Sequence, residues 1–443
     1  MRVVIIGAVA AGTSAATELR RRDKAADIVI YEKDRYLSYS GCGMPYYLSN
    51  VFSSFEDLVP RDASFFKQKH NVTVQIMHEV TSIDPASGTL QVRNLITGQE
   101  FRDSYDKLVI ATGARAEKPA ITGIDRKNVF VLRNISDMKN IKTFISINRP
   151  KKAAIIGSGP IGLEMAEALT KLGLKATLIA RSSVSRGLSP DLTAIIEKEL
   201  ARNNVGVITN ASIDEITDRG VLLKDGSFHA ADMILLAAGV KPAVELARSA
   251  GIELGTTGAI KVDRHMKTSD ADVYACGDCA EYYNRITGSP VYRPLGSTAN
   301  KTGIIAGNHI TGGDDEFQGI LGTSIFQVFD LTVAQTGLTE EEAVLAGYDV
   351  MVSLDKRPNK PEFMGGEEMS IKTVADRKSG QLLGCQIVGS QGVDRRIDII
   401  AAMLTLKGKA EDLVSMDLAY APPYSTPKDP LFYTGIKLRQ QKF

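Results

Sequence analysis

Cys42 is the residue whose surroundings are best suited to chemistry. It stands in the stretch 36–49, YLSYSGCGMPYYLS, between two glycines and just before Met44 and Pro45. Small residues around a thiol leave room for a planar cofactor or a substrate. Proline suits the first turn of a helix, so the run after Pro45 predicts a helix whose N-terminus would favour the thiolate of Cys42. A lone cysteine is more often a small buried residue, so the rest of the chain must decide.

The remaining cysteines and the five histidines indicate neither a metal centre nor a disulfide scaffold. Cys276 and Cys279 have C-x-x-C spacing, but no second ligand pair accompanies them, and the histidines are scattered. Four cysteines in 443 residues are typical of a reducing compartment, so we expect a cytoplasmic protein without a bound metal.

A first glycine-rich turn predicts a nucleotide site. The apolar run Val3–Ile6 leads into GAVAAG at 7–12, which is followed by a helical segment and by the strand Ile28–Tyr31. Such a turn presents N–H groups to a pyrophosphate. Glu32, which closes the strand, could accept a hydrogen bond from a ribose 2′-hydroxyl. Val9 stands where the middle glycine of G-x-G-x-x-G is expected.

A second turn carries the complete fingerprint. Ala153–Ile156 runs into GSGPIG at 157–162, and we expect a helix over about 163–172 and a strand at Ala176–Ile179. This order of strand, glycine turn, helix and strand is a specific signal for a dinucleotide.

Arg181 favours NADPH as the second nucleotide. The strand ends in Ala180-Arg181-Ser182-Ser183, where an acidic residue would mark NADH. A guanidinium could instead pair with a 2′-phosphate. NADH is the alternative, because exposed arginines are common and a merely solvated Arg181 would not select NADPH.

Three more buried strands end in candidate ligand residues. KLVIATG at 107–113, MILLAAG at 233–239 and VYACGD at 273–278 each end where ligands bind in open α/β sheets. Asp278 could reach a ribityl or phosphate group, or it could cap the helical stretch that follows.

The sequence pattern changes near Gly319, and no glycine fingerprint occurs beyond it. This part predicts an α+β domain followed by a tail, YAPPYSTPKDPLF, whose tyrosines suit an interface. We expect strands at 324–328, 332–335, 351–354, 369–374 and 382–387, and helices at 340–346 and 397–407. The whole chain is therefore expected to be α/β, with two Rossmann-like dinucleotide-binding domains and a C-terminal α+β domain.

Composition excludes two classes of partner. Lys and Arg number 53 against 52 Asp and Glu, a net charge of +1, so we expect no nucleic-acid partner. No run approaches the length of a transmembrane segment, so we expect no membrane partner either.

Taken together, these motifs resemble the flavoprotein disulfide reductases that bind two dinucleotides. GAVAAG with Glu32, ATG at 111–113, GSGPIGLE at 157–164 and CGD at 276–278 carry the resemblance, which covers essentially the whole chain. Because Cys42 has no nearby partner cysteine, the chain resembles the single-cysteine subclass of coenzyme A disulfide reductases, NAD(P)H oxidases and persulfide reductases. LRRRDK, YEKDRYLSYSGCGMPYYL and YAPPYSTPKD look most like coenzyme A disulfide reductases.

The resemblance implies a division of the chain and a set of site residues. It implies an FAD-binding domain at 1–112 and 241–318, a connecting segment at 113–150, an NAD(P)H-binding domain at 151–240 and a dimerisation domain at 319–443. It implies Cys42 as the redox cysteine and Tyr420 as a residue that reaches the partner's site in a homodimer. The implied cofactor-binding residues are Gly7, Ala8, Gly12, Glu32, Lys33, Ala111, Thr112, Gly113, Gly157, Gly159, Ile161, Gly162, Glu164, Arg181, Gly239, Gly277 and Asp278. The implied substrate residues are Ser14, Arg21, Ser38, Asn300 and Lys428.

The family also implies the reaction and its rivals. NADPH would reduce FAD, and the electrons would pass to Cys42, which forms a mixed disulfide with coenzyme A and reduces coenzyme A disulfide. Polysulfide, coenzyme A persulfide or oxygen remain alternative acceptors, with Cys42 cycling through a persulfide or sulfenate. Ala10 stands where the peroxidase and water-forming oxidase branch carries a histidine. The family's second tyrosine is replaced by Glu362 or Phe363, and its asparagine before the cysteine by Gly41.

Overall fold

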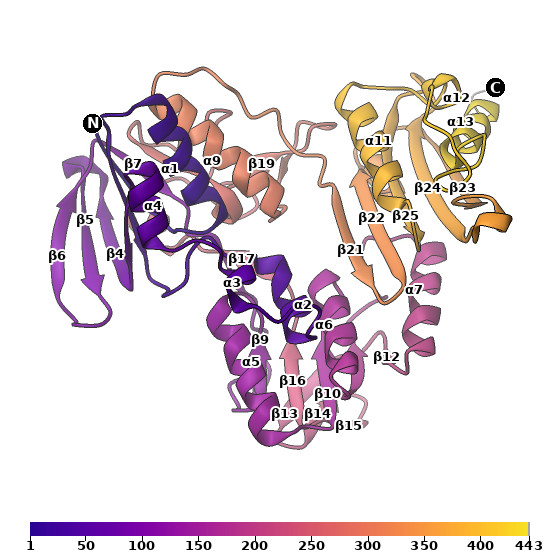
Figure 1. Cartoon of the computed structure of the whole chain (residues 1–443), viewed down its shortest axis with the longest axis horizontal. Coiled ribbons are helices and arrows are strands. Elements are labelled where there is room, and N and C mark those ends of the chain that lie inside the picture. The colour runs from indigo at the N-terminus through magenta and orange to yellow at the C-terminus, as the bar shows by residue number, and fades with distance from the viewer. Residues whose placement is uncertain (442–443) are drawn as a thin grey trace.

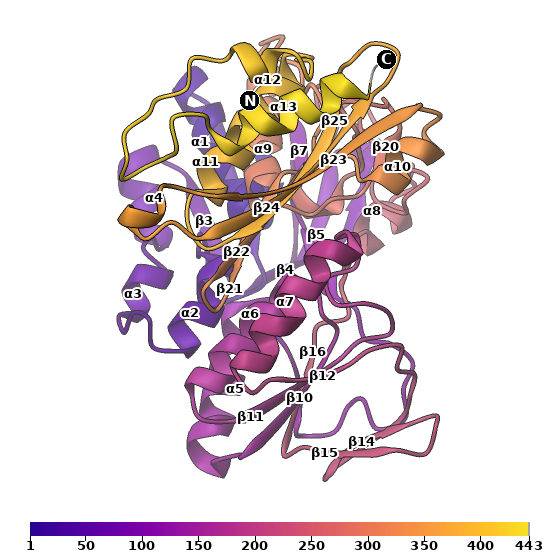
Figure 2. The same ribbon diagram turned by 90° about the vertical axis from the view of Figure 1, so that its right-hand side faces the viewer.

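A computed structural model describes residues 1–441, which form three bodies (Figures 1 and 2). The first body contains a parallel sheet of order β18-β7-β1-β2-β3. Its strands are β1 (Arg2–Ile6), β2 (Asp27–Glu32), β3 (Thr73–Ile76), β7 (Lys107–Ile110) and β18 (Val273–Ala275). All are short apolar runs, as strands covered on both faces must be.

Helices α1 (Ala10–Arg22) and α9 (Gly296–Ile310) lie side by side against this sheet (Figure 1). Two glycines of α9 allow the close approach, since a Cβ on Gly303 would lie 2.2 Å from the carbonyl oxygen of Ala11. An antiparallel sheet of β4 (His78–Asp84), β5 (Thr89–Asn94) and β6 (Glu100–Ser104) flanks the body. The first and last parts of the nucleotide-binding region are thus joined by a helix pair.

The second body repeats the pattern with the order β12-β11-β10-β16-β9, again all parallel. Strand β9 and helix α5 come from the segment 113–150, which was expected only to connect. The elements are β9 (Val129–Val131), α5 (Ile135–Asn148), β10 (Lys152–Ile156), α6 (Pro160–Lys171), β11 (Lys175–Ile179), α7 (Pro190–Arg202), β12 (Gly206–Ile208) and β16 (Met233–Leu236), with a small antiparallel sheet of β13 (Ile213–Thr217), β14 (Gly220–Leu223) and β15 (Phe228–Ala230).

The third body is an antiparallel sheet of order β21-β22-β25-β24-β23 with helices packed against it. All five predicted strands and both predicted helices form, with ends that differ by a few residues. The elements are β21 (Ser324–Val328), β22 (Leu331–Gly337), α10 (Glu340–Leu345), β23 (Val350–Pro358), β24 (Glu368–Asp376), β25 (Leu382–Gly389), α11 (Val393–Thr405), α12 (Asp412–Ser415) and α13 (Pro430–Gln440). The predicted fold class is therefore confirmed.

Shorter elements lie between and within the bodies. Helix α2 (Met44–Leu48) lies between the first and second bodies (Figure 1), and Met44 and Leu48 are buried in the core of the second body. The others are η1 (Gly41–Gly43), α3 (Phe55–Leu58), α4 (Ala63–His70), η2 (Pro85–Ser87), β8 (Ala114–Ala116), β17 (Val240–Pro242), α8 (Glu245–Ser249), η3 (Gly277–Cys279), β19 (Tyr282–Tyr283), β20 (Pro290–Val291) and η4 (Glu362–Met364). Within residues 1–441, no helix combines the length and hydropathy needed to cross a bilayer.

Candidate active site

The first glycine turn forms a cradle that only small residues fit. Gly7 has a φ of +106°, and a Cβ there would lie 2.3 Å from the carbonyl oxygen of Ala111. A Cβ on Gly12 would lie 1.9 Å from the carbonyl oxygen of Gly7. Both glycines are therefore required by the close contact between turn, helix and neighbouring strand.

Glu32 lies buried at the end of β2 beside this turn. Its carboxylate accepts hydrogen bonds from the backbone N–H groups of Ala8 and Asp34, both at 2.8 Å. Burial outweighs these bonds and raises the pKa of Glu32. Ala8, which lacks a long side chain, allows this contact.

A cavity of about 590 Å³ opens at the same edge of the sheet. It is lined by Gly7, Glu32, Lys33, Thr112 and residues of β4 and α8. Its size and its acidic residue next to a glycine turn fit the adenosine half of a dinucleotide such as FAD.

Asp278 lies in η3, just after β18, the edge strand of the same sheet. Its carboxylate pairs with the guanidinium of Arg133 at 2.8 Å. Burial raises the pKa of Asp278, and Arg133 opposes this shift. Asp278 lies within η3, so it does not cap a following helix.

The residues around Asp278 leave the backbone open toward the same edge. Gly113, Gly239 and Gly277 all have positive φ, at +70°, +117° and +78°. The hydroxyl of Thr112 donates to the carbonyl of Ala243 at 2.7 Å. Ala111 supplies the carbonyl that Gly7 faces. Together with the cavity, these residues fit FAD.

The second glycine turn repeats the cradle in the second body. Gly157 has a φ of +110°, and a Cβ on Gly162 would lie 2.1 Å from its carbonyl oxygen. Gly159 precedes α6, and Ile161 in its first turn is 38% exposed. Arg181 lies exposed at the end of β11, so its guanidinium is free to meet a ligand in solution. These residues fit a second dinucleotide.

Cys42 lies in η1, directly before α2, at the junction of the two nucleotide bodies. The side chain is exposed, whereas the other three cysteines are buried. The expectation of a thiolate favoured by a helix N-terminus is wrong, because the pKa of Cys42 is raised. Desolvation by the surrounding protein is the largest cause, followed by the negative charge of Glu164, while Arg133 acts in the opposite direction. Helix α2 has only five residues.

Glu164 lies on α6, and the phenol of Tyr46 on α2 donates to its carboxylate at 3.2 Å. Burial is the largest cause that raises the pKa of Glu164 to about 7, and the bond from Tyr46 lowers it. This carboxyl group therefore connects the helix after the second glycine turn to the helix after the cysteine loop.

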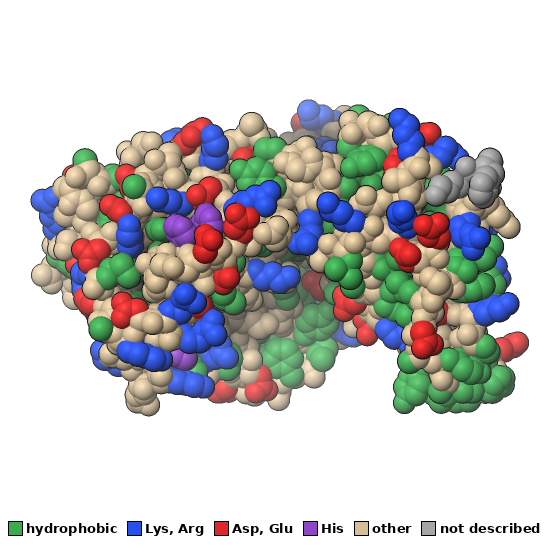
Figure 3. All heavy atoms as spheres, turned by 90° about the horizontal axis from the view of Figure 1, so that it is seen from above, with side chains coloured by type: hydrophobic (Ala, Val, Ile, Leu, Met, Phe, Trp, Pro, Cys, Tyr) green, Lys and Arg blue, Asp and Glu red, His purple; other side chains and the backbone are tan. Residues whose placement is uncertain are grey.

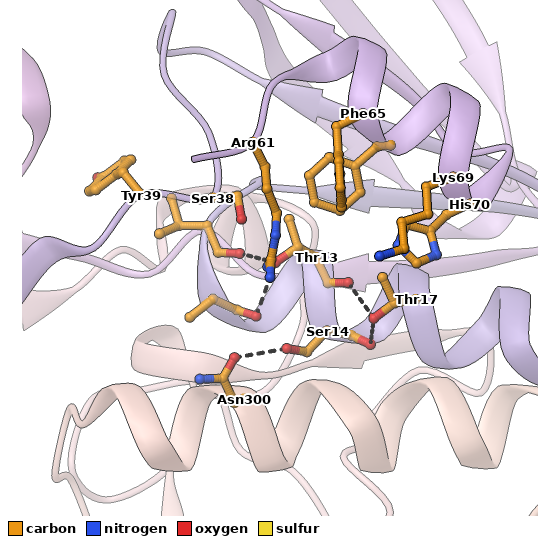
Figure 4. Close-up of a pocket in the computed structure, with 13 residues that line it drawn as sticks. Thr13, Ser14, Thr17, Ser38, Tyr39, Arg61, Phe65, Lys69, His70 and Asn300 are labelled. Carbon is orange, nitrogen blue, oxygen red and sulfur yellow. Dashed lines mark hydrogen bonds between the residues drawn. The ribbon is translucent and has the colours of Figure 1, made fainter. Parts of the chain in front are cut away.

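A second cavity of about 460 Å³ lies between α1 and α4 (Figure 4). Three of the predicted substrate residues line it: Ser14, Ser38 and Asn300. The hydroxyl of Ser14 donates to the side-chain oxygen of Asn300 at 2.8 Å. Arg61 and Lys69, which the sequence reasoning did not single out, point into the same space (Figure 4). These cations suit a phosphorylated ligand.

The other predicted site residues lie elsewhere in the single chain. Arg21 is outside the cavity and pairs with Glu18 at 2.5 Å. Tyr420 and Lys428 belong to the C-terminal body, and Tyr420 is half exposed. Sequence reasoning also missed Arg133 and Tyr46. In the sequence, only the positive charge of Arg61 and Lys69, which follow the Cys42 stretch, could have drawn attention to Arg61 and Lys69.

Comparison with known proteins identifies the family. The family model described as pyridine nucleotide-disulphide oxidoreductase matches residues 1–298. The model for the dimerisation domain of the same family matches residues 323–429. The chain belongs to the pyridine nucleotide-disulphide oxidoreductases. The predicted class of enzyme, an NAD(P)H-dependent flavoprotein disulfide reductase, is thereby confirmed.

Similar family members span the whole chain. The NAD(P)H sulfur oxidoreductase (CoA-dependent) of Pyrococcus furiosus is 38% identical and covers 99% of each chain. The coenzyme A disulfide reductase of Staphylococcus haemolyticus is 33% identical and also covers 99% of each.

Two solved structures share the fold throughout. Reduced CoADR-RHD of Bacillus anthracis is 33% identical with a TM-score of 0.98, covering 100% of this chain and 80% of that one. The second is an engineered water-forming NADPH oxidase bound to NADPH, derived from an oxidase of Lactobacillus brevis. It is 27% identical with a TM-score of 0.95, and the match covers 100% of this chain and 99% of that one.

Proposed function

We propose that this oxidoreductase uses NADPH to reduce the disulfide of coenzyme A through a mixed disulfide on Cys42. The observation that carries the proposal is the cavity beside the cysteine loop. Ser38 and Tyr39 line it and lie a few residues before Cys42, so a ligand held there can extend toward the thiol. Arg61 and Lys69 supply positive charge for phosphates.

The chain's residues divide the reaction between them. The thiolate of Cys42 attacks one sulfur of the substrate disulfide, forms a mixed disulfide and expels one coenzyme A thiolate, which takes up a proton. Bound FAD would supply two electrons, taken from NADPH as a hydride, for cleavage of the mixed disulfide and release of the second thiol. The predicted FAD residues would hold this cofactor, and the charges of Arg133 and Asp278 both act on Cys42.

A second acceptor class is favoured by the relatives. The Pyrococcus enzyme is named a CoA-dependent sulfur oxidoreductase. Polysulfide or coenzyme A persulfide is therefore the alternative substrate, and Cys42 would then cycle through a persulfide. The same cavity would serve, because the coenzyme A moiety is common to both.

The assignment of NADPH rests on Arg181 and the residues around it. In the engineered NADPH oxidase, three consecutive residues, Asp, Ala and Met, are replaced by Ala, Arg and Ser. This chain carries the same three residues in the same order at Ala180, Arg181 and Ser182. They begin eighteen residues after Gly162, and in the engineered oxidase the three replaced residues begin eighteen residues after a glycine that was also replaced. A guanidinium and a hydroxyl in place of a carboxylate favour a 2′-phosphate.

We further propose a cytoplasmic homodimer in which Tyr420 and Lys428 approach the partner's site. The match to the family's dimerisation domain over residues 323–429 supports this arrangement. Exposed aromatic side chains in the same body, including Phe363 at 78% and Tyr424 at 71%, also support it. Figure 3 shows hydrophobic side chains gathered at one edge of the C-terminal body.

The test is the intact mass of the purified protein under denaturing, non-reducing conditions, before and after dithiothreitol. Loss of one coenzyme A, mapped to Cys42, is the expected result. Loss of only one or a few sulfur atoms would favour the persulfide alternative. A protein without any adduct, and without disulfide-dependent NADPH oxidation, would overturn the proposal.

A further inference from the structure

Gln386 connects the C-terminal body to the loop that carries Arg181. The loop, residues 180–189, joins β11 to α7, and α7 lies directly under the C-terminal sheet (Figure 1). The side chain of Gln386, on β25, is 6% exposed. Its oxygen accepts from the backbone N–H of Ser189 at 2.9 Å, and its nitrogen donates to the carbonyl of Gly187 at 2.6 Å.

The other side of the loop is fixed to the glycine turn. The N–H of Ser185 donates to the carbonyl of Ser158 at 3.0 Å, and the hydroxyl of Ser158 lies 3.4 Å from the carbonyl of Ser183. Val184 is fully buried between these attachments. The loop is therefore held at its middle by the nucleotide-binding body and at its end by the C-terminal body.

Both cationic side chains of the loop are exposed and free to meet a ligand. Arg181 and Arg186 are exposed, while Val184, Ser185, Leu188 and Ser189 are buried. Arg181 stands at the end of β11, where the ribose of a nucleotide on the second glycine turn would lie. A loop fixed at its middle and at its end presents a guanidinium with less loss of conformational entropy on binding.

We propose that Gln386 is a positioning residue for the site that binds the 2′-phosphate of NADPH. This inference rests on the proposed NADPH preference. Both ends of the buried amide are satisfied by loop backbone, so no other side chain of similar size can replace it without losing a bond. The C-terminal body thus sets nucleotide selectivity from outside the nucleotide-binding domain.

A second contact supports this coupling between the bodies. The carboxylate of Glu167, on α6, accepts from the N–H of Phe329 at 2.7 Å, in the turn between β21 and β22. Phe329 has a φ of +52°, a conformation that needs such support. The helix after the glycine turn and the loop after β11 are therefore both fastened to the same sheet.

The experiment compares Gln386→Met, which removes both bonds at nearly constant volume, with wild type. Losing two neutral hydrogen bonds should raise KM for NADPH roughly threefold to tenfold, with KM for NADH changed less than twofold. Calorimetric binding of adenosine 2′,5′-bisphosphate should weaken similarly, while binding of ADP stays unchanged. Gln335→Met is the control, because Gln335 pairs with Gln386 across the β22–β25 ladder and its side chain has no hydrogen bond to the loop within residues 1–441.

Two further variants make the result decisive. Gln386→Asn keeps the amide but is too short to reach both partners, so it should show the same selectivity loss if the methionine variant folds poorly. Arg181→Ala tests the NADPH preference itself. If Arg181→Ala loses selectivity but neither Gln386 variant does, the inference is wrong while the proposed function stands. If Arg181→Ala does not alter selectivity, the 2′-phosphate assignment fails and the inference falls with it.

Discussion

The phenol of Tyr46 donates a hydrogen bond of 3.2 Å to the carboxylate of Glu164. This bond joins the helix that follows Cys42 to the helix that follows the second glycine turn. It therefore links the loop of the proposed redox cysteine to the helix of the proposed NADPH site. Both partners are only partly exposed, so their ionisation is sensitive to what surrounds them.

Glu164→Gln should change how the melting temperature depends on pH. The pKa of Glu164 is raised from 4.5 to about 7, chiefly by burial. The folded state then keeps a proton that the unfolded state has lost, so stability decreases as pH rises across this window. Glu164→Gln has no carboxyl group at this position and therefore does not lose stability in this way. Its melting temperature relative to wild type should increase from pH 5 to pH 8.

Tyr46→Phe provides the matched comparison. Because the bond from Tyr46 lowers the pKa of Glu164, its removal should move the pH midpoint upward. A pH-independent difference between Glu164→Gln and wild type would contradict the assignment of this titration to Glu164.

Cys42→Ser should abolish reduction of coenzyme A disulfide while NADPH still reduces the bound flavin. A hydroxyl cannot form the mixed disulfide. Stopped-flow absorbance of the flavin and a thiol-release assay separate the two steps. Cys385→Ala is the control, since this buried thiol lies in the C-terminal sheet. Disulfide turnover that survives in Cys42→Ser would remove the cysteine from the mechanism.

Lys69→Ala and Arg61→Ala should each raise KM for coenzyme A disulfide about tenfold. Each variant removes a charge-assisted contact to the substrate, and the lower end of the ~1.5–3 kcal/mol range for such contacts corresponds to this change. Steady-state kinetics at constant NADPH give the constants. Arg21→Ala is a sharp control, since Arg21 lies outside the cavity and pairs with Glu18. If Arg21 matters more than Lys69, the cavity is not the coenzyme A site.

The sequence was sufficient for the two nucleotide folds because their signals are local. Gly7 and Gly157 are forced by close contacts within one turn, and the flanking strands are short apolar runs. The five strands of the C-terminal sheet could be predicted from their β-branched runs for the same reason. Their ends moved by a few residues because pairing with neighbours, such as Pro358 with Glu368, extends strands beyond the apolar core.

The interactions that position the site could not be predicted this way. The pairs Arg133–Asp278, Tyr46–Glu164 and Gln386–Ser189 join residues more than one hundred positions apart. The upward shift of the Cys42 pKa comes first from desolvation and then from the charge of Glu164, and folding brings about both. No local pattern encodes these contacts, so the expectation of a favoured thiolate could not take them into account.

Tyr420→Phe should slow disulfide turnover while flavin reduction by NADPH stays near normal. In the proposed homodimer this phenol reaches the partner's site and stabilises the departing thiolate by a hydrogen bond, so about a tenfold to hundredfold loss is expected. Tyr424→Phe, in the same exposed segment, should leave turnover unchanged. Equal loss of flavin reduction and turnover would contradict a role in the disulfide step alone.

Arg396 should be the most sensitive position for the segment that carries Tyr420 and Lys428. Its fully buried guanidinium contacts both carboxylate oxygens of Asp429, at 3.2 and 2.9 Å, and the hydroxyl of Ser425 at 3.2 Å. Arg396→Met leaves Asp429 buried without this partner, which should cost ~3–5 kcal/mol in the free energy of unfolding. Arg395→Met is the control, because Arg395 contacts the same carboxylate from a more exposed position and should cost at most ~1 kcal/mol.

The pH dependence of the same pair gives an independent check. Burial alone would raise the pKa of Asp429, but the charge of Arg396 and the hydrogen bonds to the carboxylate together outweigh it, and the net shift is downward from 3.8. A carboxyl whose pKa is lower in the folded state stabilises the fold above its unfolded value, and this contribution is lost as pH falls through the folded value. Urea unfolding at pH 7 and at about pH 3, below the unfolded value, should therefore show a smaller acid-induced loss in Arg396→Met than in wild type. An unchanged loss would mean that Asp429 does not depend on Arg396 for its charge.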